Sequence, residues 1–200
     1  MLKDYVGIAS VGIYSNGISI AESIWMVAKS MSLVQYSWIS NSDNREDSAR
    51  ITLLLVKAGF FASLLFLIPL LLLPVEAYVF IFGKGFAEVK PVIVTLLPGV
   101  LIYNISILLG HYFSGTGRYS INSRISAIGL VVSVILYFTL IPLLNIKGAG
   151  IATSISYLFT SILFLWYFAR ENKNWYHDIV PKRQDFTTIV TEFKSALKIK

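Results

Sequence analysis

Two charged residues, Glu22 and Lys29, lie near the middle of an otherwise apolar stretch. The segment from Ile13 to Ile39 is long enough to cross a bilayer, which takes about 20 apolar residues in a helix. A separation of seven residues is two helical turns, so the two charges are expected on one side of the helix, about 10 Å apart. Because a charge at mid-membrane costs at least about 2.5–3.5 kcal/mol, that side should face a wet or protein-filled interior, which the other spans enclose.

The pair Glu22 and Lys29 admits two interpretations. Ionisable residues inside a membrane span usually serve function, so the two could line a substrate path or a proton relay. The alternative is a structural ion pair that only lets a polar helix insert.

The composition indicates an all-α integral membrane protein. The chain has 200 residues, of which 56% are hydrophobic and 14% charged, and its mean hydropathy is +0.69. A soluble domain usually carries about a quarter charged residues. The net charge of +6 does not indicate a nucleic-acid partner, because the basic residues are scattered rather than gathered in one patch. The lack of cysteine excludes disulfides, a thiol nucleophile and a Cys-based zinc site.

About five membrane spans can be drawn in a bundle that covers residues 1–170. They are residues 13–39, 51–73, 91–113, 121–141 and 148–168. All are expected to be helical, because an open sheet would leave unpaired backbone groups in hydrocarbon. Pro98–Gly99 should kink the third span. The remaining residues, 171–200, form a polar tail in which Asp185–Lys200 has the spacing of an amphipathic helix on anionic lipid, although a disordered tail is the alternative.

The distribution of Lys and Arg predicts the orientation. Eleven of them fall on the side of the tail and four on the side of Met1, which the positive-inside rule interprets as a cytoplasmic C-terminus and an external Met1. An external start without a signal peptide suggests that the chain is the later part of something longer.

Three further polar residues are candidates for the substrate path. Asn104, in the third span, either faces the interior or hydrogen-bonds to a neighbouring helix. Arg118 and Arg124 flank the turn before the fourth span, where they could form a gate for an anionic head group, because arginine forks suit phosphate oxygens. The alternative is an ordinary cytoplasmic loop.

A stripe of small residues on the fifth span predicts close helix packing. Its members are Gly148, Ala152, Ser156 and Thr160. No phosphate-binding loop, HExxH, GxSxG or carboxylate pair of a sugar transferase is present, and the two histidines lack a metal spacing. The sequence therefore predicts no enzyme, no catalytic residue, no cofactor and no metal.

Four segments together resemble bacterial polysaccharide flippases. They are VGIYSNGISIAESIWMVAKSMS, FGKGFAEVKPVIVTLLPGVLIYNIS, GHYFSGTGRYSINSRIS and LIPLLNIKGAGIATSISYLF. In this order they look like the O-antigen and repeat-unit translocases of the multidrug/oligosaccharidyl-lipid/polysaccharide exporter superfamily, over about residues 6–170. The resemblance implies two six-helix lobes around a central cavity, with the five spans as helices eight to twelve. Because the first lobe and the seventh helix are absent, it implies a missing N-terminal lobe or a second copy of the chain as a partner.

The resemblance implies translocation of undecaprenyl-pyrophosphate-linked oligosaccharides across the bacterial cytoplasmic (inner) membrane, for O-antigen, lipopolysaccharide or another surface polysaccharide. An anionic pyrophosphate would seek Lys29 and the cytoplasmic arginines while its lipid tail stays in the membrane lipid, and Glu22 could couple flipping to a proton or sodium gradient. A drug/cation antiporter of the same superfamily is an alternative, although Lys29 opposes the one acidic residue inside a span. A truncated, non-transporting membrane fragment is another.

Overall fold

The chain is all-helical in the computed structural model, which describes residues 2–42, 44–172 and 175. Its helices, in chain order, are α1 (Leu2–Val6), α2 (Ile8–Glu22), α3 (Trp25–Ser40), α4 (Arg45–Leu72), α5 (Val75–Phe82), the 3₁₀ turn η1 (Lys84–Phe86), α6 (Val89–Gly115) and α7 (Tyr119–Glu171). Within the described residues, three helical stretches are long and apolar enough to cross a membrane: α4, the segment Lys84–Gly115 that contains α6, and α7. The predicted all-helical membrane fold is therefore confirmed, whereas the number of spans stays a prediction.

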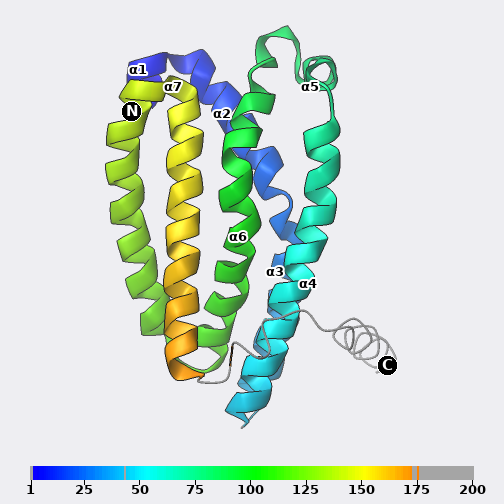
Figure 1. Cartoon of the computed structure of the whole chain (residues 1–200), viewed down its shortest axis with the longest axis vertical. Helices are drawn as coiled ribbons and strands as arrows, with labels where there is room; N and C mark the ends of the chain where they lie inside the picture. Colours follow the sequence, from blue (N-terminus) through cyan, green and yellow to red (C-terminus); the bar gives the residue numbers. More distant parts are fainter. Residues whose placement is uncertain (1, 43, 173–174, 176–200) are drawn as a thin grey trace.

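Helix α6 lies in the middle of the bundle and packs against α2, α3, α4 and α7 (Figure 1). Leu96, Val100 and Leu108 are fully buried there, each facing a neighbouring helix. A helix that is apolar all round is suited to burial on every side, whereas a helix with polar positions needs one wet side. The interior is thus organised around α6, and not around the stretch that carries Glu22 and Lys29.

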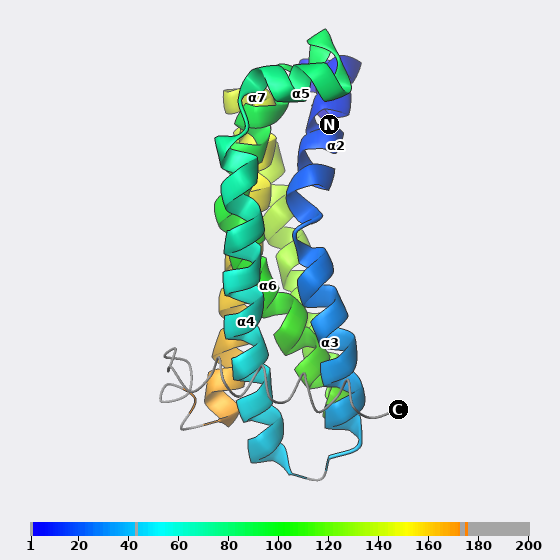
Figure 2. The ribbon, with the colours of Figure 1, turned by 90° about the vertical axis from the view of Figure 1, so that its right-hand side faces the viewer.

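The predicted first span, residues 13–39, is divided into two helices, and the single helix was wrong. Figure 2 shows the break between α2 and α3. Ser23 Oγ donates to the carbonyl of Ile20 at 2.7 Å, and the N–H of Met26 bonds to the carbonyl of Ser23 at 3.1 Å, one residue short of the helical repeat. Serine side chains that bond back to the preceding turn often bend helices, and Ser23 makes such a bond at the break.

The predicted fourth and fifth spans are the two antiparallel arms of α7, residues 119–144 and 146–171 (Figure 1). The chain reverses at Asn145, whose φ of 53° and ψ of −133° are not helical. Gly148 allows the tight return, because a Cβ at this position would lie 2.1 Å from the carbonyl oxygen of Leu140. Pro142 lies inside the first arm, just before the reversal.

The second arm approaches α6 very closely. A Cβ on Gly99 would lie 2.4 Å from Ser154 Cα, and one on Gly150 would lie 2.0 Å from Thr95 Oγ1. Ser154 Oγ accepts a hydrogen bond from the N–H of Gly99 at 2.8 Å, directly after the Pro98 position where α6 lacks one backbone donor. The predicted small-residue stripe belongs to this second arm, and all four of its members are buried.

The connections gather at the two ends of the bundle. Helices α1 and α5 and the reversal of α7 lie at one end, and the turns that lead into α4 and α7 lie at the other (Figures 1 and 2). Helix α4 begins earlier than the predicted residue 51, because Asn44 caps it: its side chain accepts from the N–H groups of Glu46 and Asp47 at 3.0 and 3.4 Å. The amphipathic helix predicted at Asp185–Lys200 lies outside the described residues.

Candidate functional site

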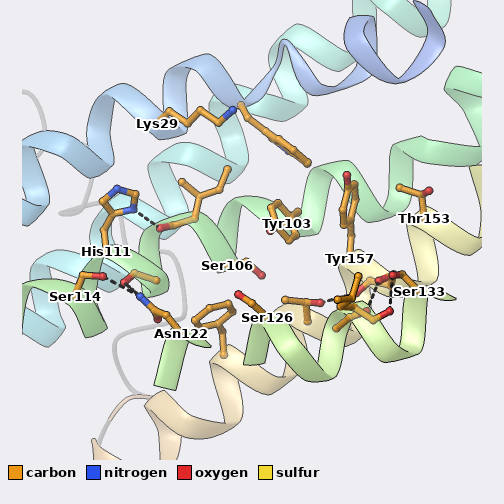
Figure 3. A pocket seen from close by; sticks show the side chains of 18 of the residues that line it. Lys29, Tyr103, Ser106, His111, Ser114, Asn122, Ser126, Ser133, Thr153 and Tyr157 are labelled. Carbon is orange, nitrogen blue, oxygen red and sulfur yellow. Dashed lines mark hydrogen bonds between the residues drawn. The ribbon is translucent and has the colours of Figure 1, made fainter. Parts of the chain in front are cut away.

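A cavity of about 640 Å³ lies between α3, α6 and the two arms of α7 (Figure 3). Its lining combines polar side chains with aromatic and aliphatic ones. The hydroxyl and amide side chains that line it are Tyr103, Ser106, Ser114, Asn122, Ser126, Ser133, Tyr137, Thr153, Ser156, Tyr157 and Thr160. Small residues such as serine leave room between helices, so the same side chains create the space and make it hydrophilic.

Three aromatic rings from three different elements meet at this cavity. The ring of Tyr103 lies 4.7 Å from that of Trp25 and 4.5 Å from that of Tyr157, between ring centroids, and Trp25 and Tyr157 are 5.2 Å apart. Trp25 is fixed by its Nε1, which donates to the carbonyl of Val100 at 2.8 Å. The cluster is therefore a rigid aromatic surface in the wall of the cavity, because each ring is held by the other two.

Lys29 reaches the cavity from α3, one turn after Trp25 (Figure 3). Its ammonium lies 5.6 Å from the centroid of the Trp25 ring, and its side chain is exposed. Among the described residues that line the cavity, Lys29 is the only lysine or arginine, and none is an aspartate or glutamate. The described lining therefore carries one lysine and no carboxylate.

His111 lies on α6 and faces α3. Its Nε2 lies 3.4 Å from Ser32 Oγ, and its Nδ1 lies 2.8 Å from the carbonyl oxygen of Ile107. A carbonyl oxygen only accepts hydrogen bonds, so Nδ1 carries the proton in this arrangement. The Ser32 hydroxyl donates to the carbonyl of Lys29 at 2.8 Å, so Nε2 of this tautomer lies beside the Ser32 oxygen without receiving that proton.

Glu22 is not paired with Lys29. Its Oε1 accepts a short hydrogen bond of 2.5 Å from the hydroxyl of Tyr157, and the described residues record no ion pair between the two charges. The break between α2 and α3 separates them, so the single helical stripe expected from their spacing does not form. Glu22 therefore touches the cavity only through Tyr157, whereas Lys29 lines it directly.

Hydrogen bonds tie the helices together at both ends of the cavity. Toward the reversal of α7, Thr153 Oγ1 lies 2.6 Å from the hydroxyls of both Tyr14 and Tyr137, which joins α2 to both arms of α7. Toward the other end, Asn122 Nδ2 donates to the Gly110 carbonyl and to Ser114 Oγ, each at 2.8 Å. The Oδ1 atom of Asn122 is buried and has no hydrogen-bond partner among the described residues, so it remains an available acceptor.

The other predicted site residues lie away from this cavity. Asn104 is buried and donates to Ser63 Oγ on α4 at 2.8 Å and to the Leu101 carbonyl at 2.9 Å, which is a packing contact. Arg118 forms an ion pair with Glu171 and lies over the rings of Tyr112 and Phe113, with distances of 5.4 and 5.2 Å to their centroids.

Arg124 is exposed on the first arm of α7. Arg118 instead lines a second cavity of about 560 Å³, together with Arg45 and Arg50 at the start of α4. The structure therefore brings only Lys29, of the five candidates, into the lining of the main cavity.

Sequence reasoning missed the aromatic cluster. Trp and Tyr are enriched at membrane–water interfaces, yet Trp25, Tyr103 and Tyr157 each stand near the middle of a predicted span. Their position near the middle of a span could have indicated a site inside the bundle, because a buried aromatic side chain with a polar group needs a hydrogen-bond partner there. No group of three metal-ligating side chains occurs among the described residues.

A curated protein from Staphylococcus aureus, described as "Capsular polysaccharide biosynthesis protein CapF", is 26% identical to the chain over 173 residues. The aligned part is 85% of this chain and 44% of that protein, so the chain spans less than half of the relative's length. No family model matches the chain, and no solved structure matches it.

Proposed function

We propose that the chain is part of a flippase that moves undecaprenyl-pyrophosphate-linked oligosaccharides across the bacterial cytoplasmic membrane for surface polysaccharide biosynthesis. The observation that carries this proposal is a polar cavity with one lysine and no carboxylate in its described lining, set between helices of membrane-spanning length. The similarity to a capsular polysaccharide biosynthesis protein supports the same area of biosynthesis.

Lys29 is proposed to receive the pyrophosphate. The exposed Lys29 ammonium, 5.6 Å from the centroid of the Trp25 ring, can make charge-assisted hydrogen bonds to phosphate oxygens. The polyprenyl tail can stay in lipid while the head group enters the polar cavity. No covalent bond is made or broken in this role, so the proposal is a non-enzymatic one.

A cation antiporter is less well supported by the same geometry. Its cavity would need carboxylates for cationic substrates, whereas the lining presents Lys29, and Glu22 is engaged by Tyr157. The chain spans 44% of its relative's length, and alternating access needs two lobes that rock against each other. We therefore propose that a further lobe or a second copy of this chain completes the transporter, with the C-terminus in the cytoplasm and Arg118 and Arg124 at the cytoplasmic end.

Charge substitutions at Lys29 test the proposal in a host whose surface polysaccharide depends on this chain. Lys29→Arg should retain polysaccharide assembly, because the charge that meets the pyrophosphate remains. Lys29→Ala should lose most of it at unchanged membrane abundance. Lys84→Ala is the matched control, since Lys84 is exposed in η1 at the opposite end from the cytoplasmic turns and should have no effect.

The double substitution Glu22→Gln with Lys29→Gln separates a substrate role from mutual neutralisation. If Lys29 only balanced the charge of Glu22, removing both charges would leave no unpaired buried charge and would restore assembly. The proposal instead expects the double variant to insert normally and to remain inactive. Full polysaccharide assembly by the double variant would refute the role of Lys29 in the substrate path.

A further inference from the structure

The second cavity lies at the end of the bundle where α4 begins (Figure 1). Its volume is about 560 Å³, and its described lining has no residue in common with that of the main cavity. The walls come from α4, from α6 and from the end of the second arm of α7. Its charged lining residues are Arg45, Glu46, Asp47, Arg50, Arg118 and Glu171. A ligand in this cavity therefore meets charges of both signs.

The depth of this cavity coincides with the headgroup layer of a membrane. Helix α4 has 28 residues, which at about 1.5 Å per residue makes it about 42 Å long. The hydrocarbon core of a bilayer is about 30 Å thick, so about eight residues of α4 extend beyond it. All charged residues of α4 except Lys57 lie between Arg45 and Arg50, so the surplus is at this end. The part of the lining that α4 provides is thus at the level of phospholipid headgroups.

Half of the six charged side chains are already engaged within the protein. Arg118 forms its ion pair with Glu171, and Asp47 accepts a hydrogen bond of 2.7 Å from the side chain that caps α4. Arg45 and Arg50 are exposed, and neither forms an ion pair in the part of the chain that the structure describes. A guanidinium group presents a planar fork of N–H donors that matches phosphate oxygens. The two arginines can therefore both bind a phosphate group.

The same cavity also suits a positive charge. Glu46 forms no ion pair with any described residue, and Trp175 brings an aromatic ring to the lining. A primary ammonium has three N–H donors for a carboxylate, and the face of an indole ring attracts a cation. A headgroup with only negative charge would instead share the cavity with the carboxylates of Glu46 and Asp47, which would repel it. The lining is thus complementary to a zwitterion.

We propose that the second cavity binds the headgroup of phosphatidylethanolamine, a phospholipid that carries a phosphate and a primary ammonium. Arg45 and Arg50 bind the phosphate, Glu46 and Trp175 bind the ammonium, and the acyl chains remain in the bilayer. The bound lipid is a fixed component of the bundle and is not transported. This site requires only that the chain spans a membrane, so it does not rest on the proposed flippase function.

Native mass spectrometry of the detergent-purified full chain measures this binding. The delipidated chain is titrated with phosphatidylethanolamine, phosphatidylcholine and phosphatidylglycerol that have the same acyl chains. Phosphatidylethanolamine should bind most tightly, because choline has no N–H donor and glycerol has no cation. The double substitution Arg45→Gln with Arg50→Gln should weaken its binding by at least about tenfold, since the charged donors to the phosphate are lost.

Two single variants make the test specific. Arg170→Gln is the matched control, because Arg170 is an exposed arginine at the same end of the bundle that lies over Trp166 and outside the described lining. It should leave the binding of phosphatidylethanolamine unchanged. Glu46→Gln should remove the preference for phosphatidylethanolamine over phosphatidylglycerol, whereas a general loss of structure would weaken both lipids alike.

Several results would overturn the proposal. They are equal binding of the three lipids, tighter binding of phosphatidylglycerol than of phosphatidylethanolamine, and equal weakening by Arg170→Gln and the double arginine variant. Displacement of phosphatidylethanolamine by undecaprenyl pyrophosphate would also overturn it, because the cavity would then belong to the transport path. Lys29→Ala should bind phosphatidylethanolamine as the wild-type chain does, so failure of the flippase proposal and failure of this site are distinguishable.

Discussion

The contact between Gly99 and Ser154 makes a strong prediction about stability. In Gly99→Ala the new Cβ would lie 2.4 Å from Ser154 Cα and 2.6 Å from the Ser154 carbonyl oxygen. Ordinary van der Waals contact begins at 3.4 Å, so α6 and the second arm of α7 must separate by about 1 Å. The opposing atoms belong to the backbone, so no side-chain rotation can relieve the clash.

The magnitude has two parts. Overpacking of this kind costs about 1–3 kcal/mol. A separation of about 1 Å also breaks the 2.8 Å hydrogen bond from the Gly99 N–H to Ser154 Oγ, and an unsatisfied buried donor costs about 1–3 kcal/mol. The better helix propensity of alanine returns about 0.5–1 kcal/mol. The net loss is therefore about 1–5 kcal/mol, or roughly 2–20 °C in the midpoint of thermal unfolding for a chain of this size.

Thermal unfolding of the detergent-purified chain, followed by circular dichroism, measures the effect. Gly12→Ala is the matched control, because Gly12 is also inside a helix but nothing lies within 4 Å of its would-be Cβ. That control should raise the midpoint slightly. Equal midpoints for Gly99→Ala and Gly12→Ala would refute the close packing of α6 against α7.

Three more changes have expected outcomes. Asn145→Gly should stabilise the chain by about 1 kcal/mol and Asn145→Val should destabilise it in the same unfolding assay, because the positive φ of 53° strains any residue with a side chain. Asn44→Ala should cost about 1 kcal/mol while Asn44→Ser retains the cap of α4, and hydrogen exchange at the first turn of α4 would report the difference. A reporter enzyme that works only outside the cell should be silent when fused after Lys200; strong activity would overturn the predicted orientation.

The helical membrane fold could be predicted because composition and span length almost determine it. A bilayer admits only helices or closed barrels, and runs of about 20 apolar residues permit only the former. Pro74, Pro91 and Pro142 lie within two residues of the end of α4, the start of α6 and the end of the first arm of α7, because proline lacks the N–H that a continuing helix needs. The break at Ser23 was missed because one serine in an apolar helix is usually tolerated, and only the tertiary contacts on either side of it decide whether the helix bends.

The main cavity could be predicted only in part. Lys29 stood out because an ion in a membrane span is costly, and that reasoning led to a residue that lines the cavity. Asn104 and Arg118 were polar candidates on the same grounds, yet their side chains contact Ser63 and Glu171 instead of the cavity. No local sequence pattern specifies the rotation of a helix about its own axis, which decides where such a side chain points. Which side of a membrane helix faces a cavity depends on how neighbouring helices pack, and this information is distributed over several distant segments.

The break between α2 and α3 changes what the two mid-span charges can do. On one straight helix, Glu22 and Lys29 would share a stripe and each would reduce the charge that the other presents to a ligand. With the break between them, Tyr157 donates to Glu22 while the Lys29 ammonium stays beside Trp25. The rings of Tyr157 and Trp25 also contact each other. Two aromatic side chains therefore lie between the two charges, which form no ion pair in the described part of the chain. An anion that binds the Lys29 ammonium therefore meets no carboxylate in the described lining of the cavity.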